Sequence, residues 1–285
     1  MKERFLKYPP FLQVVLLLMI GFVTFSICSM LASLVLEGFY PDLSVQTALS
    51  EAARFPVQYM FLFYLPFQLG FLLTPGLTYL WLTRDNEKKV FPEKSTSGVI
   101  YAFLFFIAIF LLLPLLNEIN IYLVDSLGMF EQLEAEKIRM DQQMIMLFGK
   151  NASVEAYIFA VIVIGLITGI SEELAFRRFL FHHLFKNTGK LWLSVVASAF
   201  VFALLHFNYL QFIPLFCFGV ILAIMYQLSG SIWPAVLAHT LNNMLNIYWL
   251  RNENFPYWME NIELKTTIPS TVLLMGLLYL KYLRK

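Results

Sequence analysis

Two adjacent carboxylates lie in a hydrophobic part of the sequence, where charged side chains are rare. Glu172 and Glu173 are followed by Arg177 and Arg178, so four charges fall within one short stretch. On a helix, Glu173 and Arg177 are i,i+4 neighbours and can form an ion pair, whereas Glu172 is rotated by about 100° from Glu173. Glu172 is then a candidate general base. The alternative is that both glutamates lie in interfacial water and pair with the two arginines.

Two further polar sites follow in apolar segments. His206 ends the run FVFALLH, while His239 and Asn243 lie in WPAVLAHTLNN at i,i+4 spacing, which places them on one helix face. Asn242 and Asn246 lie near the same stripe. Ionisable side chains are costly at mid-bilayer, so they usually face a bundle interior or a water-filled cavity. The alternatives are an ordinary helix-end histidine at His206 and hydrogen bonding between helices around His239.

The spacing predicts that these sites lie at similar depths in a membrane. A polar turn at Gly189 separates two apolar runs, and Glu172 and His206 lie equally far before and after it. At about 1.5 Å per residue, both lie about 25 Å from the turn on antiparallel neighbours. His239 and Asn243 lie about 12–20 Å along the next helix, measured from a turn on the same side. We therefore expect these groups to share one intramembrane cavity.

Such a set of side chains is suited to hydrolysis. A carboxylate beside a histidine can deprotonate water, and histidine and amide donors can stabilise the oxyanion that forms when water attacks a carbonyl. The sequence contains neither the GxSxG motif of serine hydrolases nor the HExxH motif of soluble zinc proteases. Zinc bound by Glu172, His206 and His239 from separate helices is also compatible with the spacing.

The elements that must position these residues are membrane-spanning helices. The chain is 59% hydrophobic and 14% charged, with a mean hydropathy of +0.70, which is too apolar for the surface of a soluble domain. The net charge of +1 argues against nucleic acid as a partner. Hydrophobic runs of about 20 residues predict an all-α polytopic membrane bundle. The eight predicted helices are 11–36, 58–82, 98–124, 154–180, 191–207, 211–229, 231–250 and 266–282.

The distribution of basic residues predicts the orientation of the bundle. If the N-terminus lies inside, the inner loops carry most of the 20 lysines and arginines, so both termini are expected in the cytoplasm. Arg178 and the pair His182–His183 are expected near the inner headgroups. Residues 130–150 mix charge with Met, Leu and Phe, which predicts an amphipathic helix on the outer surface. A partner-binding element is the alternative for this segment.

The three polar sites also match, in order, the motifs EExxxR, FxxxH and HxxxN. These are EELAFR at 172–177, FALLH at 202–206 and HTLNN at 239–243. In this respect the chain resembles the CPBP (CAAX protease and bacteriocin-processing, or Abi) family of intramembrane proteases, and it is similar to the type II CAAX prenyl endopeptidases. The resemblance divides the chain into an N-terminal membrane region (1–153), a catalytic core (154–250) and a C-terminal helix (251–285), within one integral membrane unit.

The resemblance implies a role for each matching position. Glu172 would activate the attacking water, His206 would help to hold it, and His239 and Asn243 would stabilise the oxyanion. The second glutamate and the arginine of EExxxR would support the site. The resemblance implies a glutamate-dependent endopeptidase without a cofactor, although zinc at the three ligands named above is the alternative.

These observations predict an intramembrane endopeptidase of CAAX-processing type in a multi-pass protein of a bacterial cell membrane. Because a bacterial cell usually lacks prenylated proteins, we expect the substrate to be another membrane-associated or lipid-modified peptide or protein. The alternative is a non-enzymatic membrane scaffold or bacteriocin-immunity protein that acts by binding. A transporter is disfavoured, because transporters often show repeated halves and the polar residues here lie in one half only.

Overall fold

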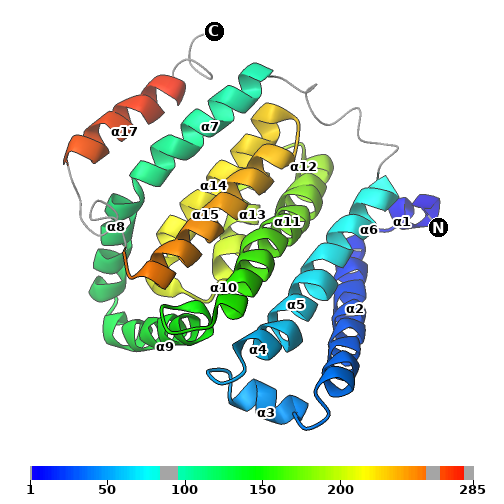
Figure 1. Cartoon of the computed structure of the whole chain (residues 1–285). Coiled ribbons are helices and arrows are strands. Elements are labelled where there is room, and N and C mark those ends of the chain that lie inside the picture. The colour runs from blue at the N-terminus through cyan, green and yellow to red at the C-terminus, as the bar shows by residue number, and fades with distance from the viewer. Residues whose placement is uncertain (1, 84–95, 255–263, 279–285) are drawn as a thin grey trace. The chain divides into compact units, whose positions relative to one another are not determined.

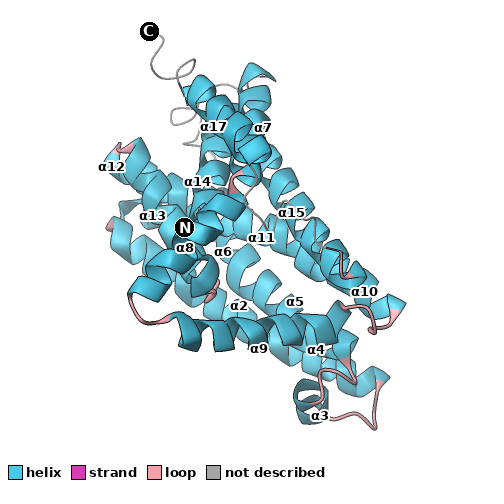
Figure 2. Cartoon of the chain, turned by 90° about the vertical axis from the view of Figure 1, so that its left-hand side faces the viewer, coloured by secondary structure: helices cyan, strands magenta, loops and turns pink. Residues whose placement is uncertain are grey.

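The computed structural model describes residues 2–83, 96–254 and 264–278. Within these ranges every regular element is a helix and none is a strand (Figure 2). The all-α fold class is therefore confirmed for this part of the chain. The residues group into two compact units. The first unit consists of the described residues within 1–90, 142–187 and 239–254. The second unit consists of the described residues within 91–141, 188–238 and 255–285.

The first unit is built from three long helical runs and the end of a fourth. In Figure 1 the three runs are the blue helices, the cyan helices and the green helices α10 to α12, and the end of the fourth run belongs to the orange α15. Their segments are α1 (Lys2–Lys7), α2 (Pro10–Phe39), α3 (Val45–Ser50), α4 (Pro56–Leu62), α5 (Tyr64–Pro66), the π-helical η1 (Phe67–Leu73), α6 (Thr74–Thr83), α10 (Val154–Ala160), the π-helical η3 (Val161–Ile167), α11 (Thr168–Glu173), the π-helical η4 (Leu174–Phe181), α12 (His182–Thr188) and the C-terminal part of α15 (Trp233–Asn252).

Close backbone contacts at two glycines order the helices of this unit. A Cβ atom on Gly70 of η1 would lie 2.4 Å from Cα of Phe25 on α2, and Thr24 Oγ1 donates a hydrogen bond to the Gly70 carbonyl at 2.7 Å. A Cβ atom on Gly76 of α6 would lie 2.8 Å from the carbonyl carbon of Leu174 in η4. The run η1–α6 is therefore packed between α2 on one side and α11–η4 on the other (Figure 1).

The opposite end of the first unit is closed by an apolar cluster. Its buried members come from α4, from the end of α9 (Phe130–Phe148), from α10 and from α15, and they are Met60, Leu147, Phe148, Ala156, Ala160 and Ile247. Arg251 on α15 adds hydrogen bonds to the carbonyls of Gly149 and Ala152, which follow α9. These contacts fix α15 against the beginning of the run that contains the two glutamates.

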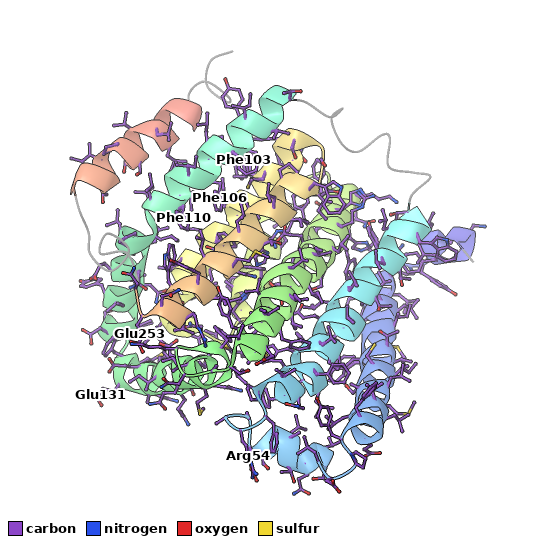
Figure 3. The ribbon with its side chains drawn as sticks, viewed as in Figure 1. Arg54, Phe103, Phe106, Phe110, Glu131 and Glu253 are labelled. Atoms are coloured by element: carbon purple, nitrogen blue, oxygen red, sulfur yellow. The ribbon has the colours of Figure 1, made fainter. Side chains whose placement is uncertain are left out.

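The second unit is built around α14. Its segments are α7 (Thr96–Leu111), α8 (Leu113–Ser126), the beginning of α9, α13 (Leu191–Leu204), the short η5 (Tyr209–Gln211), α14 (Phe212–Ser229), the start of α15 and α17 (Leu264–Leu278). Phe103, Phe106 and Phe110 lie along α7 (Figure 3), and the Phe106 ring meets the edge of Phe218 on α14 at 6.2 Å. Asn120 of α8 accepts a hydrogen bond from the Ile213 amide at 2.9 Å.

Four helical runs in the described ranges are long and apolar enough to cross a membrane. They are Pro10–Phe39, Pro56–Thr83, Val154–Thr188 and Tyr209–Ser229. The pair Gly98–Leu111 and Leu113–Ser126 makes a fifth candidate with a bend of 51°. Pro114 lies in the first turn after the break and cannot donate a backbone hydrogen bond to the preceding turn. Helices also form at the three other predicted positions, as α13, α15 and α17. Residues 279–282 of the last predicted helix lie outside the described residues.

The predicted amphipathic helix at 130–150 forms as α9. Leu133, Leu147 and Phe148 are buried, whereas Glu131 and Glu134 are exposed, so the helix is amphipathic as expected. Its last turns belong to the first unit, where Gln143 donates a hydrogen bond to the Tyr59 hydroxyl at 2.7 Å.

Candidate active site

The two adjacent glutamates end a short α-helical segment, α11, that lies between the π-helical segments η3 and η4. Wide helical turns of this kind are frequent at functional sites. Only 9% of Glu172 and none of Glu173 is exposed. Both carboxylates are thus buried rather than open to interfacial water. Burying a charge is costly unless it is paired and hydrogen-bonded, so their partners define the site.

The predicted ion pair between Glu173 and Arg177 is present. Nη1 of Arg177 lies 2.8 Å from Oε1 of Glu173, and both side chains are almost completely buried, with exposures of 1% and 0%. The i,i+4 pair therefore forms although η4 departs from α-helical geometry. Breaking a buried pair by removing one partner typically costs about 3–5 kcal/mol, because the other charge is left uncompensated. The pair fixes the position of Glu173.

His239 joins this pair from α15. Its Nδ1 lies 2.8 Å from the same Oε1 atom of Glu173, and its Nε2 lies 3.8 Å from Oε2 of Glu172. Because the same Glu173 oxygen also accepts from Nη1 of Arg177, it acts as the acceptor, so Nδ1 is the nitrogen that donates, and Nε2 is directed toward Glu172. The 3.8 Å separation is longer than a hydrogen bond. One glutamate therefore orients the histidine, and the histidine faces the other glutamate.

Asn243 also contacts the glutamate-bearing run. It lies one turn after His239 on α15, and its Nδ2 donates a hydrogen bond to the Ile164 carbonyl in η3 at 3.2 Å. The predicted common face of His239 and Asn243 is therefore real, and it faces η3 and α11. Asn246 instead donates to the carbonyl of Asn242 on its own helix at 2.8 Å.

A close approach of two helices, which the spacing of the motifs does not predict, allows these contacts. A Cβ atom on Gly169 of α11 would lie 2.3 Å from Oγ1 and 3.0 Å from the backbone nitrogen of Thr240 on α15. Only a glycine fits at this distance without a shift. Gly169 lies three residues before Glu172, and Thr240 follows His239. The isolated glycine in ITGISEE is the signal that could have indicated this crossing.

His206, the remaining predicted catalytic residue, lies in the second unit just after α13. Its Nδ1 is 2.7 Å from the Phe202 carbonyl, which can only accept, so Nδ1 carries the proton. The Phe202 ring packs against the imidazole with a centroid distance of 4.4 Å. Phe202 and His206, the two defined residues of the FxxxH motif, are thus in direct contact with each other. That His206 shares a cavity with the glutamates stays a prediction.

Arg178, His182 and His183 are expected near the inner headgroups, and that depth stays a prediction. The helical run that carries them continues to Thr188, beyond the predicted end at residue 180. All three side chains are buried, with exposures of 8%, 1% and 3%. His183 Nε2 consequently lies 3.1 Å from the Pro10 carbonyl at the start of α2, and the Tyr79 ring of α6 packs against both histidines.

Among the described residues, no group of three or more His, Cys, Asp or Glu side chains is arranged to hold a metal ion. The zinc ligands considered from the sequence, Glu172, His206 and His239, come from both units, so that set stays a prediction.

A known protein family matches the part of the chain that carries the candidate site residues. Residues 154–245, about a third of the chain, match the family model of the type II CAAX prenyl endopeptidase Rce1-like proteins. The matched range runs from the start of α10 into α15 and contains all three motifs. No curated protein and no solved structure matches the chain. Together with the apolar helices, the match supports an integral membrane protein, and for residues 154–245 it confirms the resemblance to the CPBP family of CAAX-type intramembrane proteases.

Proposed function

We propose that the protein is an intramembrane endopeptidase that hydrolyses a peptide bond in a membrane-associated or lipid-modified peptide or protein. The observation that carries the proposal is the buried contact between Glu173 and His239, which directs Nε2 of the histidine toward Glu172 inside the Rce1-like domain. A carboxylate and an oriented imidazole that face each other in a buried site are groups that peptide hydrolysis requires.

Glu172 is the proposed general base. Its carboxylate takes a proton from the attacking water as the hydroxyl oxygen bonds to the scissile carbonyl carbon. The same proton is then delivered to the leaving amine when the carbon–nitrogen bond breaks, so Glu172 returns to its ionised form. Its small exposure of 9% limits access by bulk water, and electrostatic interactions are stronger in such a site.

His239 and Asn243 are the proposed oxyanion donors. Glu173 holds the Nδ1–H group of His239, so the ring has one fixed orientation, and Nε2, when protonated, can donate to the oxyanion. An amide nitrogen has two N–H groups, and the bond from Asn243 to the Ile164 carbonyl uses one of them. The second is the one we assign to the oxyanion. Arg177 acts indirectly, because it holds the Glu173 carboxyl oxygen that orients His239.

His206 is proposed to help hold the water through Nε2, since its Nδ1–H is engaged by the Phe202 carbonyl. This assignment rests on the order of the three motifs and on the tautomer that the local contact selects. No cofactor is proposed.

The proposed membrane topology has eight spanning helices with both termini in the cytoplasm of a bacterial cell. The core at 154–250 is flanked by the N-terminal region 1–153 and the C-terminal helix 251–285. The five apolar candidates would be completed by α13, α15 and α17. Helix α15 is less apolar because it carries the histidine and asparagines of the site. Such a helix is tolerated within a bundle when its polar face is buried against other helices.

The test is hydrolysis of quenched fluorescent peptides by the detergent-purified protein. The peptides are apolar and are offered with and without an attached lipid, including a prenyl group, so that the assay also identifies the substrate class. Glu172→Gln keeps the size of the side chain but removes the base, and it should abolish cleavage. Glu131→Gln is the matched control, since Glu131 is exposed at the start of α9 (Figure 3) and should retain wild-type rates.

Two results would contradict the proposal. Equal cleavage by the wild type and Glu172→Gln would remove Glu172 from the mechanism. Absence of cleavage by the wild type across the whole set of peptides would favour the alternative in which the protein binds a partner without hydrolysing it.

A further inference from the structure

A polar contact joins the N-terminal region, outside the matched domain, to the residue that precedes Glu172. The Ser171 hydroxyl donates a hydrogen bond to Oε1 of Gln68, although the two residues are 103 positions apart. Ser171 is completely buried, and Gln68 is 5% exposed. We infer that Gln68 is a positioning residue for Glu172, which means that the N-terminal helices set the geometry of the site. The inference rests on the proposed function, because it assigns the base to Glu172.

Gln68 itself lies on a backbone that is held in place. It lies in η1, two residues before Gly70, where η1 touches the backbone of α2 too closely for any larger residue. The hydrogen bond from Thr24 to the Gly70 carbonyl adds a directional contact at 2.7 Å. The backbone from which the Gln68 side chain extends is therefore held against α2.

Contacts from the run η1–α6 lie on both sides of the two glutamates. Gln68 binds Ser171 on the N-terminal side, and Gly76 touches the backbone of Leu174 on the C-terminal side. Glu172 and Glu173 are the two residues between these contacts. If α11 rotated about its axis or moved along it, the hydrogen bond to Gln68 would break or the contact at Gly76 would be strained.

Gln68 is expected to affect the position of Glu172 more than the stability of the fold. Hydrogen bonds between helices in membranes contribute little to stability on average. The Ser171 hydroxyl also lies 3.2 Å from the Thr168 carbonyl on its own helix, so it keeps an acceptor when Gln68 is lost. Replacing Gln68 by Met, which is similar in shape, should consequently leave the protein folded. A small displacement of a catalytic group, in contrast, can lower the rate by about a hundredfold.

The experiment compares Gln68→Met with Gln13→Met in the full-length protein. Gln13 is the matched control, because it is a glutamine of the same unit with an exposure of 7% and a local hydrogen bond to the Tyr8 carbonyl at 2.8 Å. We expect Gln68→Met to lower kcat about tenfold to a hundredfold with KM and the unfolding temperature nearly unchanged. Gln13→Met should retain the wild-type kcat.

A second measurement does not depend on catalysis. Dicyclohexylcarbodiimide, an apolar reagent that adds to carboxyl groups, is applied to the membrane-embedded protein, and the modification of Glu172 is followed by mass spectrometry. Displacement of Glu172 in Gln68→Met should change its labelling rate by about threefold or more, whereas Gln13→Met should label like the wild type.

The outcomes separate this inference from the proposed function. If the wild type cleaves no peptide, the proposed function fails and the labelling rates alone decide whether Gln68 positions Glu172. If Gln68→Met matches the wild type in both kcat and labelling, the inference is wrong. It is also overturned if Gln13→Met produces the same losses, since the effect would then belong to any buried glutamine of the unit.

Discussion

One carboxylate oxygen of Glu173 lies 2.8 Å from Nδ1 of His239, although the two residues are 66 positions apart in the chain. The same oxygen lies 2.8 Å from Nη1 of Arg177. An adjacent glutamate and a buried arginine thus fix the ring of the histidine that faces Glu172. The two glutamates of the motif therefore have different roles. Glu173 orients His239, and Glu172 remains as the proposed general base.

The role of Glu173 can be tested by its replacement with glutamine. Glu173→Gln leaves the Arg177 charge buried without its counterion, so we expect a loss of stability of about 3–5 kcal/mol. The double variant Glu173→Gln/Arg177→Met removes that charge and should recover most of the stability. Its activity should stay low, because His239 still lacks the carboxylate that orients it. Unfolding in denaturing detergent and peptide hydrolysis measure the two effects, and recovery of activity in the double variant would contradict this role.

The two nitrogens of His239 can be tested separately. In His239→Asn, the amide nitrogen can replace Nδ1 as the donor to Glu173, but nothing replaces Nε2. We expect stability close to that of the wild type and a loss of kcat of about a hundredfold or more. His239→Ala removes both nitrogens and should lose stability as well as activity. If His239→Asn hydrolysed peptide at the wild-type rate, Nε2 would have no part in the reaction.

The local part of the site could be predicted from the sequence, whereas most of its long-range contacts could not. The Glu173–Arg177 pair follows from i,i+4 spacing and is present. The sequence also indicated that His239 and Asn243 share a face. It could not show that His239 binds Glu173, because no local pattern reports a contact between distant segments. The π-helical segments η1, η3 and η4 were missed because the spacing arguments assume 3.6 residues per turn.

The limits of helix prediction have a similar physical origin. The run that contains the glutamates extends to Thr188 because LFHHLFKNT is compatible with helix, and hydropathy alone does not mark its end. His182 and His183 are consequently buried against other helices. Gln68 was not identified either, although a lone glutamine in the apolar run FLFYLPFQLGFLL is a signal that a polar partner must exist.

The proposed mechanism also predicts the response to metal removal. Because Glu172, His239 and Asn243 supply the base and the oxyanion donors in this proposal, strong zinc chelators should leave hydrolysis unchanged. The measurement is the rate of peptide cleavage before and after dialysis against chelator, with metal content determined in parallel. Loss of activity that added zinc restores would instead assign Glu172, His206 and His239 as metal ligands.

The crossing of α11 and α15 predicts a strong effect at Gly169. In Gly169→Ala the new Cβ atom would lie 2.3 Å from Oγ1 and 3.0 Å from the backbone nitrogen of Thr240, so the helices must move apart. Overpacking of this kind costs about 1–3 kcal/mol. The same shift separates His239 from both glutamates, so kcat should fall by about tenfold to a hundredfold.

Two further variants make the Gly169 prediction specific. Gly38→Ala is the control, since a Cβ atom at that position of α2 meets nothing within 4 Å, and both stability and activity should be maintained. Gly169→Ala/Thr240→Ala removes the nearest clashing atom and should regain part of the activity, although the backbone nitrogen of residue 240 still limits the approach. If Gly169→Ala unfolded less readily than the wild type and kept its kcat, the two helices would not meet as closely as the structure has them, and the orientation of His239 by Glu173 would need another cause.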